Sequence, residues 1–474
     1  MAGQLVPPLR RELRRYLRRF DRCFTNSRTR AHLPVYVEGQ LGALERKSIE
    51  PVALDAGVPP RTLQEFLGLH QWDEDLMRRC VAGIIQEDHG HDEAIAVIDE
   101  TTVVKKGNMT AGVQRQYCGS TGKVENCVAT VHLGFVGGGL ATLVDGDLFL
   151  PSGWAEDEDR RRKAKIPREV LYRPKWQIAL DILTRTSDAG VRFRWLTADE
   201  GYGRVTAFRE AVAARGLMYV VEIPNATMGW TSKPVLEPLP RATELDGTPR
   251  NRVRLGDRKA RKVSALWERG GPSWKMYRVK DTDKGPAVWE VRETVFYPQL
   301  DGLPGTQQRL LVAHNVMTGE VKYFLANAPS SIPVKILLTV AFSRWNIERN
   351  FEDSKGEVGL DHFEVRQYRA IIRHLAISNV SMLFLAEQTA RLRGGKSVVD
   401  LPAGEAGDGC AGQAGTQRSA EVATAGSSGP EDLVLAETGV GRRRLAYEAA
   451  TTRTQEAPGG SASDHEMSFT TLAL

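Results

Sequence analysis

The sequence predicts an α/β fold, in which a catalytic domain follows a helical region and is interrupted by a β-rich insertion. Two observations support this prediction. The chain has 474 residues, more than one hydrophobic core usually organises, so we expect a catalytic domain with at least one added module. After residue 90, three apolar runs of strand length come first, and helical segments then alternate with further strands.

The order of these central elements indicates a specific fold. The predicted elements are strands at 94–98, 127–135 and 140–150, a helix at 174–187, a strand within 191–203, a helix at about 203–215 and a strand at 217–223. Three strands followed by helix, strand, helix and strand is the order of an RNase H-like fold. The sequence therefore predicts an RNase H-like catalytic domain.

The remaining segments set the domain boundaries. Prolines, glycines and short β-type runs after residue 230 predict the insertion, and a helical stretch resumes at about 333 with a break near Gly356 to Gly359. The end of the chain is rich in Gly, Ala and Ser and cannot offset the entropy of ordering by burial. The predicted organisation is a helical DNA-binding region (1–90), the first part of the catalytic domain (91–229), the β-rich insertion (230–325), the last catalytic helices (326–393) and a flexible low-complexity tail (394–474), in which a short helix is expected around 431–449.

The N-terminal region predicts helices, the first of them with one basic face. Arginines recur at helical spacing over 10–22, opposite Leu13, Leu17 and Phe20. A solvated arginine face and a membrane-surface helix are alternatives to contact with DNA phosphates. The segment from 33 to 80 resembles a small helical DNA-binding module, although plain helical bundles share its texture. The residues expected to contact DNA are Arg14, Arg15, Arg18 and Arg19.

Composition restricts the compartment and the chemistry. No apolar run approaches the roughly 20 residues that span a bilayer, and the N-terminus lacks the apolar stretch of a secretory signal. We therefore expect a cytoplasmic protein without a membrane partner. The five cysteines are odd in number and scattered, with no C-x-x-C pair, which argues against disulfides and a zinc finger. Net charge is +5.

Two aspartates follow apolar strands in matching places of the predicted fold. Asp99 comes directly after AIAVI, and Asp199 ends the strand within VRFRWLTADEGYG. A single aspartate at a strand end is more often a turn or a helix cap than a ligand, but two in matching positions favour a site. Because adjacent strand residues point to opposite faces, Asp99 and Asp199 converge only if Glu100 and Glu200 point elsewhere.

A third acidic position comes from the helix FSRWNIERNFEDSKGEVGL at 342–360. Arg344, Glu348, Glu352 and Lys355 share one helical face. An ordinary amphipathic helix with i,i+4 ion pairs, each worth about 0.2–0.5 kcal/mol, is the alternative.

These residues resemble the DDE transposases of bacterial insertion sequences, in the group marked by a Tyr, Arg, Glu, Lys signature on the last catalytic helix. Arg344, Glu348 and Lys355 fit its spacing of Arg, three residues, Glu, six residues, Lys, whereas the tyrosine position falls on Ala341, next to Phe342. Further stretches resemble the subgroup named after insertion sequence seven hundred and one. The further matching stretches are ERKSIEPVA at 45–53, VIDET at 97–101, QYCGSTGKVENC at 116–127 and WLTADEGYG at 195–203, so that the resemblance covers roughly residues 20 to 390.

The resemblance implies a catalytic triad of Asp99, Asp199 and Glu348. Three carboxylates this close would repel one another unless divalent cations neutralise them, and oxygen-only ligands suit Mg²⁺, with Mn²⁺ as a substitute, better than Zn²⁺. The resemblance also implies that Arg344 and Lys355 contact phosphates of double-stranded DNA, at the transposon ends and the target, and that a homodimer assembles on DNA. Any of Trp267, Trp274 and Trp289 could stack on a flipped base, but core packing is the expected role of each.

Two rival functions remain at this point. A metal-free glycosidase could use two of the carboxylates as acid and base, and a strict metal requirement would distinguish it. A DNA-binding protein with a catalytically decayed site, derived from a transposase, is the alternative outside enzymes, because the tyrosine of the signature is replaced.

Overall fold

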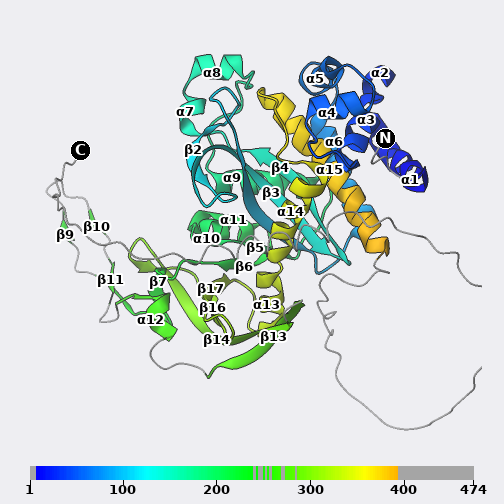
Figure 1. Cartoon of the computed structure of the whole chain (residues 1–474). Coiled ribbons are helices and arrows are strands. Elements are labelled where there is room, and N and C mark those ends of the chain that lie inside the picture. Colours follow the sequence, from blue (N-terminus) through cyan, green and yellow to red (C-terminus); the bar gives the residue numbers. More distant parts are fainter. Residues whose placement is uncertain are drawn as a thin grey trace, which may run out of the picture. The chain divides into compact units, whose positions relative to one another are not determined.

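The fold is organised around one large mixed sheet with helices on both faces (Figure 1). The computed structural model describes residues 7–238, 242–243, 249–250, 253–255, 259–267, 273–282 and 285–392. The central strands are β1 (Ile95–Val104), β2 (Gln114–Cys118), β3 (Lys123–Gly137), β4 (Leu140–Leu148), β5 (Trp195–Ala198) and β6 (Met218–Glu222). The helices between them are α7 (Ser152–Ala155), α8 (Glu158–Lys163), α9 (Lys175–Asp188), α10 (Glu200–Gly203) and α11 (Thr206–Ala214).

Strand pairing confirms the predicted RNase H-like order. β1 pairs antiparallel with β3, and β3 pairs antiparallel with β4 and β2. On its other side β1 pairs parallel with β5, which pairs parallel with β6. The connections through α9 and α11 are helical crossovers, which parallel neighbours require. The hairpin strand β2 and the short helices α7, α8 and α10 were not predicted.

One predicted strand end is wrong. The sequence indicated that the first strand stops before Asp99, but β1 continues to Val104 and stays paired with β3 throughout. Its last residues, Thr101 to Val104, are β-branched and suit a pleated strand. The parallel partner β5 ends at Ala198, opposite Ile98, so Asp99 lies inside β1 at the level where its neighbour stops.

The last helices cover one face of the sheet, and α9 and α11 cover the other. These last helices are α13 (Val334–Phe342), α14 (Trp345–Val358) and α15 (Tyr368–Leu392). Ile95 and Val97 of β1 share a core with α13 and α14, whereas Ala96 and Ile98 share one with α9 and α11. The predicted break falls where α14 ends, because Gly359 adopts φ 67°. Asp99 is two residues after Val97, so its side chain lies on the same face of β1 and faces α14.

The main described strands of the insertion join the central sheet. These strands are β7 (Met228–Trp230), β12 (Arg261–Lys262), β13 (Lys275–Thr282), β14 (Gly285–Leu300), β15 (Leu303–Pro304), β16 (Gln308–Asn315) and β17 (Val321–Ala326), with α12 (Val263–Trp267) beside them. Two further pairs are β8 (Leu236–Pro238) with β11 (Val253–Leu255), and β9 (Ala242–Thr243) with β10 (Pro249–Arg250). Because β17 pairs antiparallel with β6, the strands β14, β16 and β17 continue the central sheet.

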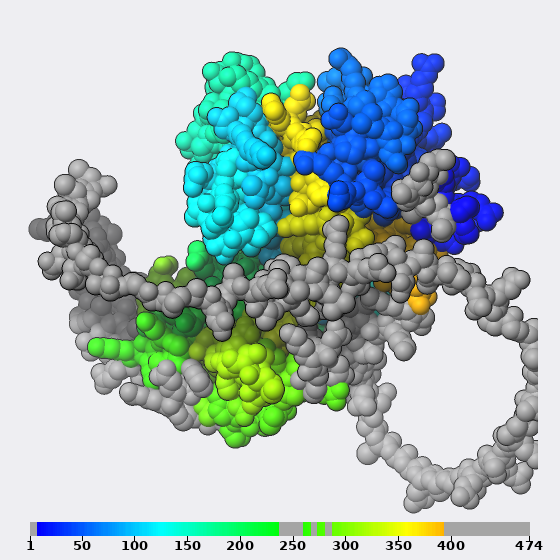
Figure 2. Space-filling model, viewed as in Figure 1, coloured from blue at the N-terminus to red at the C-terminus, as the bar shows by residue number. Residues whose placement is uncertain are grey.

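The N-terminal helices pack against α15 as well as against one another. They are α1 (Pro7–Leu17), η1 (Arg18–Cys23), α2 (Ser27–Arg30), α3 (His32–Leu41), α4 (Ile49–Asp55), α5 (Pro60–Gly68) and α6 (Glu74–His89). Leu13 and Phe66 share a core with Ile377 and Leu383 of α15. In the space-filling view the yellow residues of the last helices lie between the cyan strands and the blue N-terminal helices (Figure 2).

The long helix α15 is apolar because it is a core helix. Its length and composition would also allow it to cross a membrane, but 89% of its apolar window is buried inside the protein. Polar side chains along it find partners in α3: Tyr36 Oη lies 2.9 Å from His374 Nδ1, and Gln40 donates to Ser378 over 2.9 Å. The predicted tail at 394–474, with its expected helix at 431–449, lies outside the described residues.

Candidate active site

The two aspartates lie next to each other at one edge of the parallel strands. Ile98 pairs with Ala198, so the residues that follow, Asp99 and Asp199, occupy neighbouring positions on β1 and after β5. Asp199 also caps α10, since its carboxylate accepts a hydrogen bond of 3.2 Å from the backbone N–H of Tyr202. The helix-cap role, which the sequence presented as the alternative to a site role, is thus observed for Asp199, and its role in a site stays a prediction.

The neighbouring glutamates point away from this edge. Glu100 faces α9, where its carboxylate lies 2.5 Å from the Lys175 ammonium group. Glu200 is exposed in the first turn of α10. The condition under which Asp99 and Asp199 can share one face is thus met.

Helix α14 brings the third carboxylate over the same face. Ile347 packs within 3.6 Å of the position where a Cβ would stand on Gly134, and the Phe351 ring lies 5.3 Å from that of His132, the cross-strand partner of Asp99. Burial lowers the pKa of His132 to about 4, so this ring is neutral at pH 7. These contacts fix α14 with its N-terminal end above Asp99.

Arg344 connects two of the three acids. Its guanidinium lies 3.1 Å from an Asp99 oxygen and 2.7 Å from a Glu348 oxygen. Burial and, after it, the charge of Asp199 raise the pKa of Asp99 to about 7, while Arg344 opposes the shift. Burial by itself would lower the pKa of Arg344, but Glu348 and Asp99 raise it above its ordinary value. The site therefore holds an excess of negative charge around one cation.

A fourth carboxylate, Glu222, was not predicted. Leu196 of β5 pairs with Tyr219 of β6, so Asp199 and Glu222 occupy neighbouring positions in this register. Glu222 lies 3.1 Å from the Lys322 ammonium group and is one of the charges that raise the pKa of Arg344. The signal was present, because Glu222 closes the apolar strand LMYVVEI as Asp199 closes its own.

A cavity of about 440 Å³ opens beside these residues. Glu222, Lys322, Arg344 and Glu348 line its charged side, and Trp289 lines its apolar side. Trp289 is buried and packs against Phe342 with ring centroids 4.7 Å apart. Ala341, which takes the tyrosine position of the signature, also lines the cavity.

Of the other two tryptophans, only Trp274 has a side chain among the described residues, and it does not line this cavity. Trp274 is half-buried and stacks with Arg292, whose guanidinium carbon lies 4.3 Å from the ring centre. The side chain of Trp267 lies outside the described residues. Packing is thus observed for Trp274 and Trp289, and stacking on a base stays a prediction.

Comparison with known proteins assigns the family. Residues 19–286, more than half of the chain, match the family model described as DDE superfamily endonuclease. The chain belongs to this family. The matched segment contains Asp99 and Asp199, whereas Glu348 lies beyond it. A relative from Microchaete diplosiphon, named "Probable transposase for insertion sequence element IS701", is 27% identical over 187 residues, which are 39% of this chain and 46% of that protein. The chain thus matches less than half of that relative's length.

The donor atoms of this DDE endonuclease suit a hard divalent cation. DDE superfamily endonucleases generally use divalent metal ions, and Asp99, Asp199 and Glu348 offer carboxylate oxygens only, the ligands that Mg²⁺ and Mn²⁺ prefer. In the part of the chain that the structure describes, no three His, Cys, Asp or Glu side chains are arranged to hold a metal ion as they stand. The Arg344 guanidinium lies between Asp99 and Glu348.

Two further residues of α14 differ in their surroundings. Lys355 is half-buried, which lowers its pKa, and the Asp361 carboxylate opposes that shift. Glu352, the competing candidate for the third acid, has a side chain 74% exposed and lies 3.9 Å from Arg349, its ion-pair partner on the same helix. Glu348, and not Glu352, is therefore the glutamate connected to Asp99.

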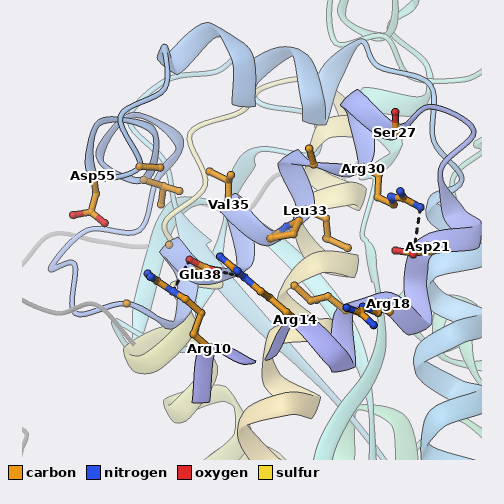
Figure 3. A pocket seen from close by; sticks show the side chains of 17 residues that line it. Arg10, Arg14, Arg18, Asp21, Ser27, Arg30, Leu33, Val35, Glu38 and Asp55 are labelled. Atoms are coloured by element: carbon orange, nitrogen blue, oxygen red, sulfur yellow. Dashed lines mark ion pairs between the residues drawn. The ribbon is translucent and has the colours of Figure 1, made fainter. Parts of the chain in front are cut away.

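The arginines of the first helix surround a separate pocket of about 740 Å³ in this endonuclease (Figure 3). Arg10 and Arg14 point toward Glu38, at 3.3 Å and 3.9 Å, while Arg30 pairs with Asp21 at 3.2 Å. Arg18 also lines the pocket and is exposed. Of the four arginines predicted to contact DNA, Arg14, Arg15 and Arg18 are exposed, whereas Arg19 forms ion pairs with Glu87 and Asp88 of α6.

Proposed function

We propose that this DDE endonuclease is a DNA transposase, which cleaves double-stranded DNA at the ends of an insertion sequence and joins the released ends to target DNA. The observation that carries this proposal is the placement of Asp99 and Asp199 at one edge of neighbouring parallel strands, with Glu348 connected to Asp99 through Arg344. The relative from Microchaete diplosiphon, which is named as a probable transposase, supports the same reaction class. The presence of all three acids that the resemblance implies favours an active enzyme over a decayed DNA-binding protein.

In the proposed mechanism Asp99, Asp199 and Glu348 would hold Mg²⁺, or Mn²⁺ as a substitute. Such ions supply activation of a water or a DNA 3′-hydroxyl and charge neutralisation at the leaving oxygen of a phosphodiester displacement. Arg344 can hold two phosphate oxygens with its planar guanidinium, and Lys355 can place a point charge beside the same DNA strand. Trp289 and Phe342 form the apolar wall that limits access of water on one side of the cavity.

A cleavage assay tests the proposal directly. Purified protein is incubated with DNA that carries the sequences flanking its own gene, with Mg²⁺, with Mn²⁺ or with a chelator. We expect strand breaks at the element ends that require the metal and disappear in Asp199→Asn. Cleavage that persists in the chelator would contradict the metal-dependent mechanism, and a glycosidase would leave the DNA intact under every condition.

The proposed partners follow from the reaction. Bringing two element ends together requires two active sites, so we expect a homodimer on DNA, acting in the cytoplasm. Size-exclusion chromatography with light scattering, with and without DNA, measures the oligomeric state. A protein that cleaves both ends as a monomer would contradict the expected assembly.

The exposed arginines of the first helix are expected to supply backbone affinity for DNA. Reversing Arg14, Arg15 and Arg18 to Glu should weaken binding and flatten the slope of log K against log salt by about 0.9 per lost phosphate contact. Arg19→Glu should instead act on folding, because Arg19 pairs with Glu87 and Asp88. A binding titration at several salt concentrations measures the slope, and an unchanged slope in the triple variant would show that this face lies off the DNA.

A further inference from the structure

The place of Arg344 has a consequence for cation binding. Its guanidinium bridges Asp99 and Glu348, which come from β1 and α14 and share no other ion-pair partner within the described part of the chain. Both carboxylates are donors in the proposed metal site, and this inference rests on that proposed function. One positive charge therefore stands where a doubly charged ion would have to bind.

The two cations exclude each other for electrostatic reasons. A guanidinium and a divalent ion that share the same carboxylate oxygens would lie within a few ångströms, where like charges repel strongly in a half-buried site. The side chain of Arg344 is 22% exposed and that of Asp99 is 12% exposed, so solvent screens this repulsion only partly. Occupancy by one cation must therefore weaken the other.

We propose that Arg344 is an exchangeable counter-ion of the active site, which holds Asp99 and Glu348 together in the free protein and must leave them before a divalent cation binds. Removing Arg344 should then raise the affinity of the free protein for the cation, although it removes a residue of the site. A residue that served only to bind DNA would not compete in this way.

The surroundings offer Arg344 another position. Glu222 lines the same cavity as Arg344 and already influences its pKa, and this carboxylate belongs to β6 rather than to the triad. A DNA phosphate in the cavity would be a second partner. By linkage, DNA that draws Arg344 away raises the cation affinity, and the cation raises the DNA affinity by the same factor.

The experiment measures Mn²⁺ binding to the full-length protein without DNA, from the loss of the electron paramagnetic resonance signal of free Mn²⁺. Arg344→Gln should bind Mn²⁺ at least about tenfold more tightly than the unaltered protein. Arg344→Lys keeps the charge but cannot span both carboxylates as a fork. Its Mn²⁺ affinity should therefore lie between those of the unaltered protein and Arg344→Gln. This second variant keeps the test decisive if Arg344→Gln does not fold.

Arg349→Gln is the matched control. It removes the same charge from the same helix, but Arg349 pairs with Asp353 at 3.0 Å and not with the triad. Its Mn²⁺ affinity should stay within about twofold of the unaltered protein, since an exposed charge is well screened.

The outcomes separate this inference from the proposed function. In one outcome, Asp99→Asn abolishes Mn²⁺ binding, but Arg344→Gln and Arg344→Lys bind Mn²⁺ no more tightly than the unaltered protein. This result would overturn the counter-ion role and leave the metal-dependent nuclease standing. Absence of Mn²⁺ binding in every variant, Arg344→Gln included, would overturn both. Equal tightening in Arg349→Gln would show a general charge effect and also reject the specific role.

Discussion

Glu348→Gln is expected to abolish DNA cleavage, a loss of at least about a thousandfold, while binding of the element ends survives. The substitution removes one carboxylate charge from the three that would hold the cations, and such groups act mainly on the transition state. Glu348 contacts Arg344 over 2.7 Å and through it joins Asp99. Rates of cleavage and a gel-shift assay on the same protein preparation separate the two effects.

Glu352→Gln is the control for Glu348→Gln, one helical turn further on α14. Its side chain is 74% exposed, and it forms an ion pair with the exposed Arg349, so we expect cleavage within about threefold of the unaltered rate. Combining Glu348→Gln with Asp99→Asn should add little, because residues that act as a unit are not additive. An inactive Glu352→Gln beside an active Glu348→Gln would reverse the assignment of the third acid.

The largest effect on stability is expected for Arg373→Leu. Arg373 is fully buried on α15, where it donates to the carbonyl oxygens of His70 and Trp72, each over 2.8 Å, and pairs with Glu74 at 3.1 Å. Replacing it leaves the half-buried Glu74 carboxylate and several carbonyl groups without this donor. We expect the free energy of unfolding to fall by about 3–5 kcal/mol, measured by urea denaturation of the full chain.

Arg369→Leu tests whether burial is the cause. Arg369 pairs with the same Glu74 at 2.7 Å, but its side chain is 46% exposed. The expected loss is within about 1 kcal/mol, since exposed ion pairs contribute little. Equal losses in the two variants would mean that the shared Glu74 pairing, and not the buried hydrogen bonds to the carbonyl groups, carries the stabilisation.

The RNase H-like core could be predicted because its signals are local. Each central strand is a short apolar run, and each crossover helix has its own entry signal, such as Pro174 before α9. The exact end of β1 could not be predicted in this way. Residues 99–104 remain in the strand because β3 pairs with them, and that partner lies some thirty residues further along the chain.

The joining of the insertion to the central sheet is also a long-range property. Val321 to Ala326 form a strand, and nothing in their sequence specifies that β6 is the partner. The same limit applies to the site. The sequence placed Asp99, Asp199 and Glu348 by spacing and resemblance, whereas the bridging position of Arg344 and the proximity of Glu222 depend on register and on how α14 crosses the sheet.

The packing of the N-terminal helices on α15 affects how the chain folds as it is synthesised. Leu13, Phe66 and their neighbours find part of their core only in a helix that leaves the ribosome after the whole sheet and the insertion. Until then their apolar surface stays in water, where nascent chains aggregate or recruit chaperones. The core that the first helices share with α15 is therefore complete only after α15 has been synthesised.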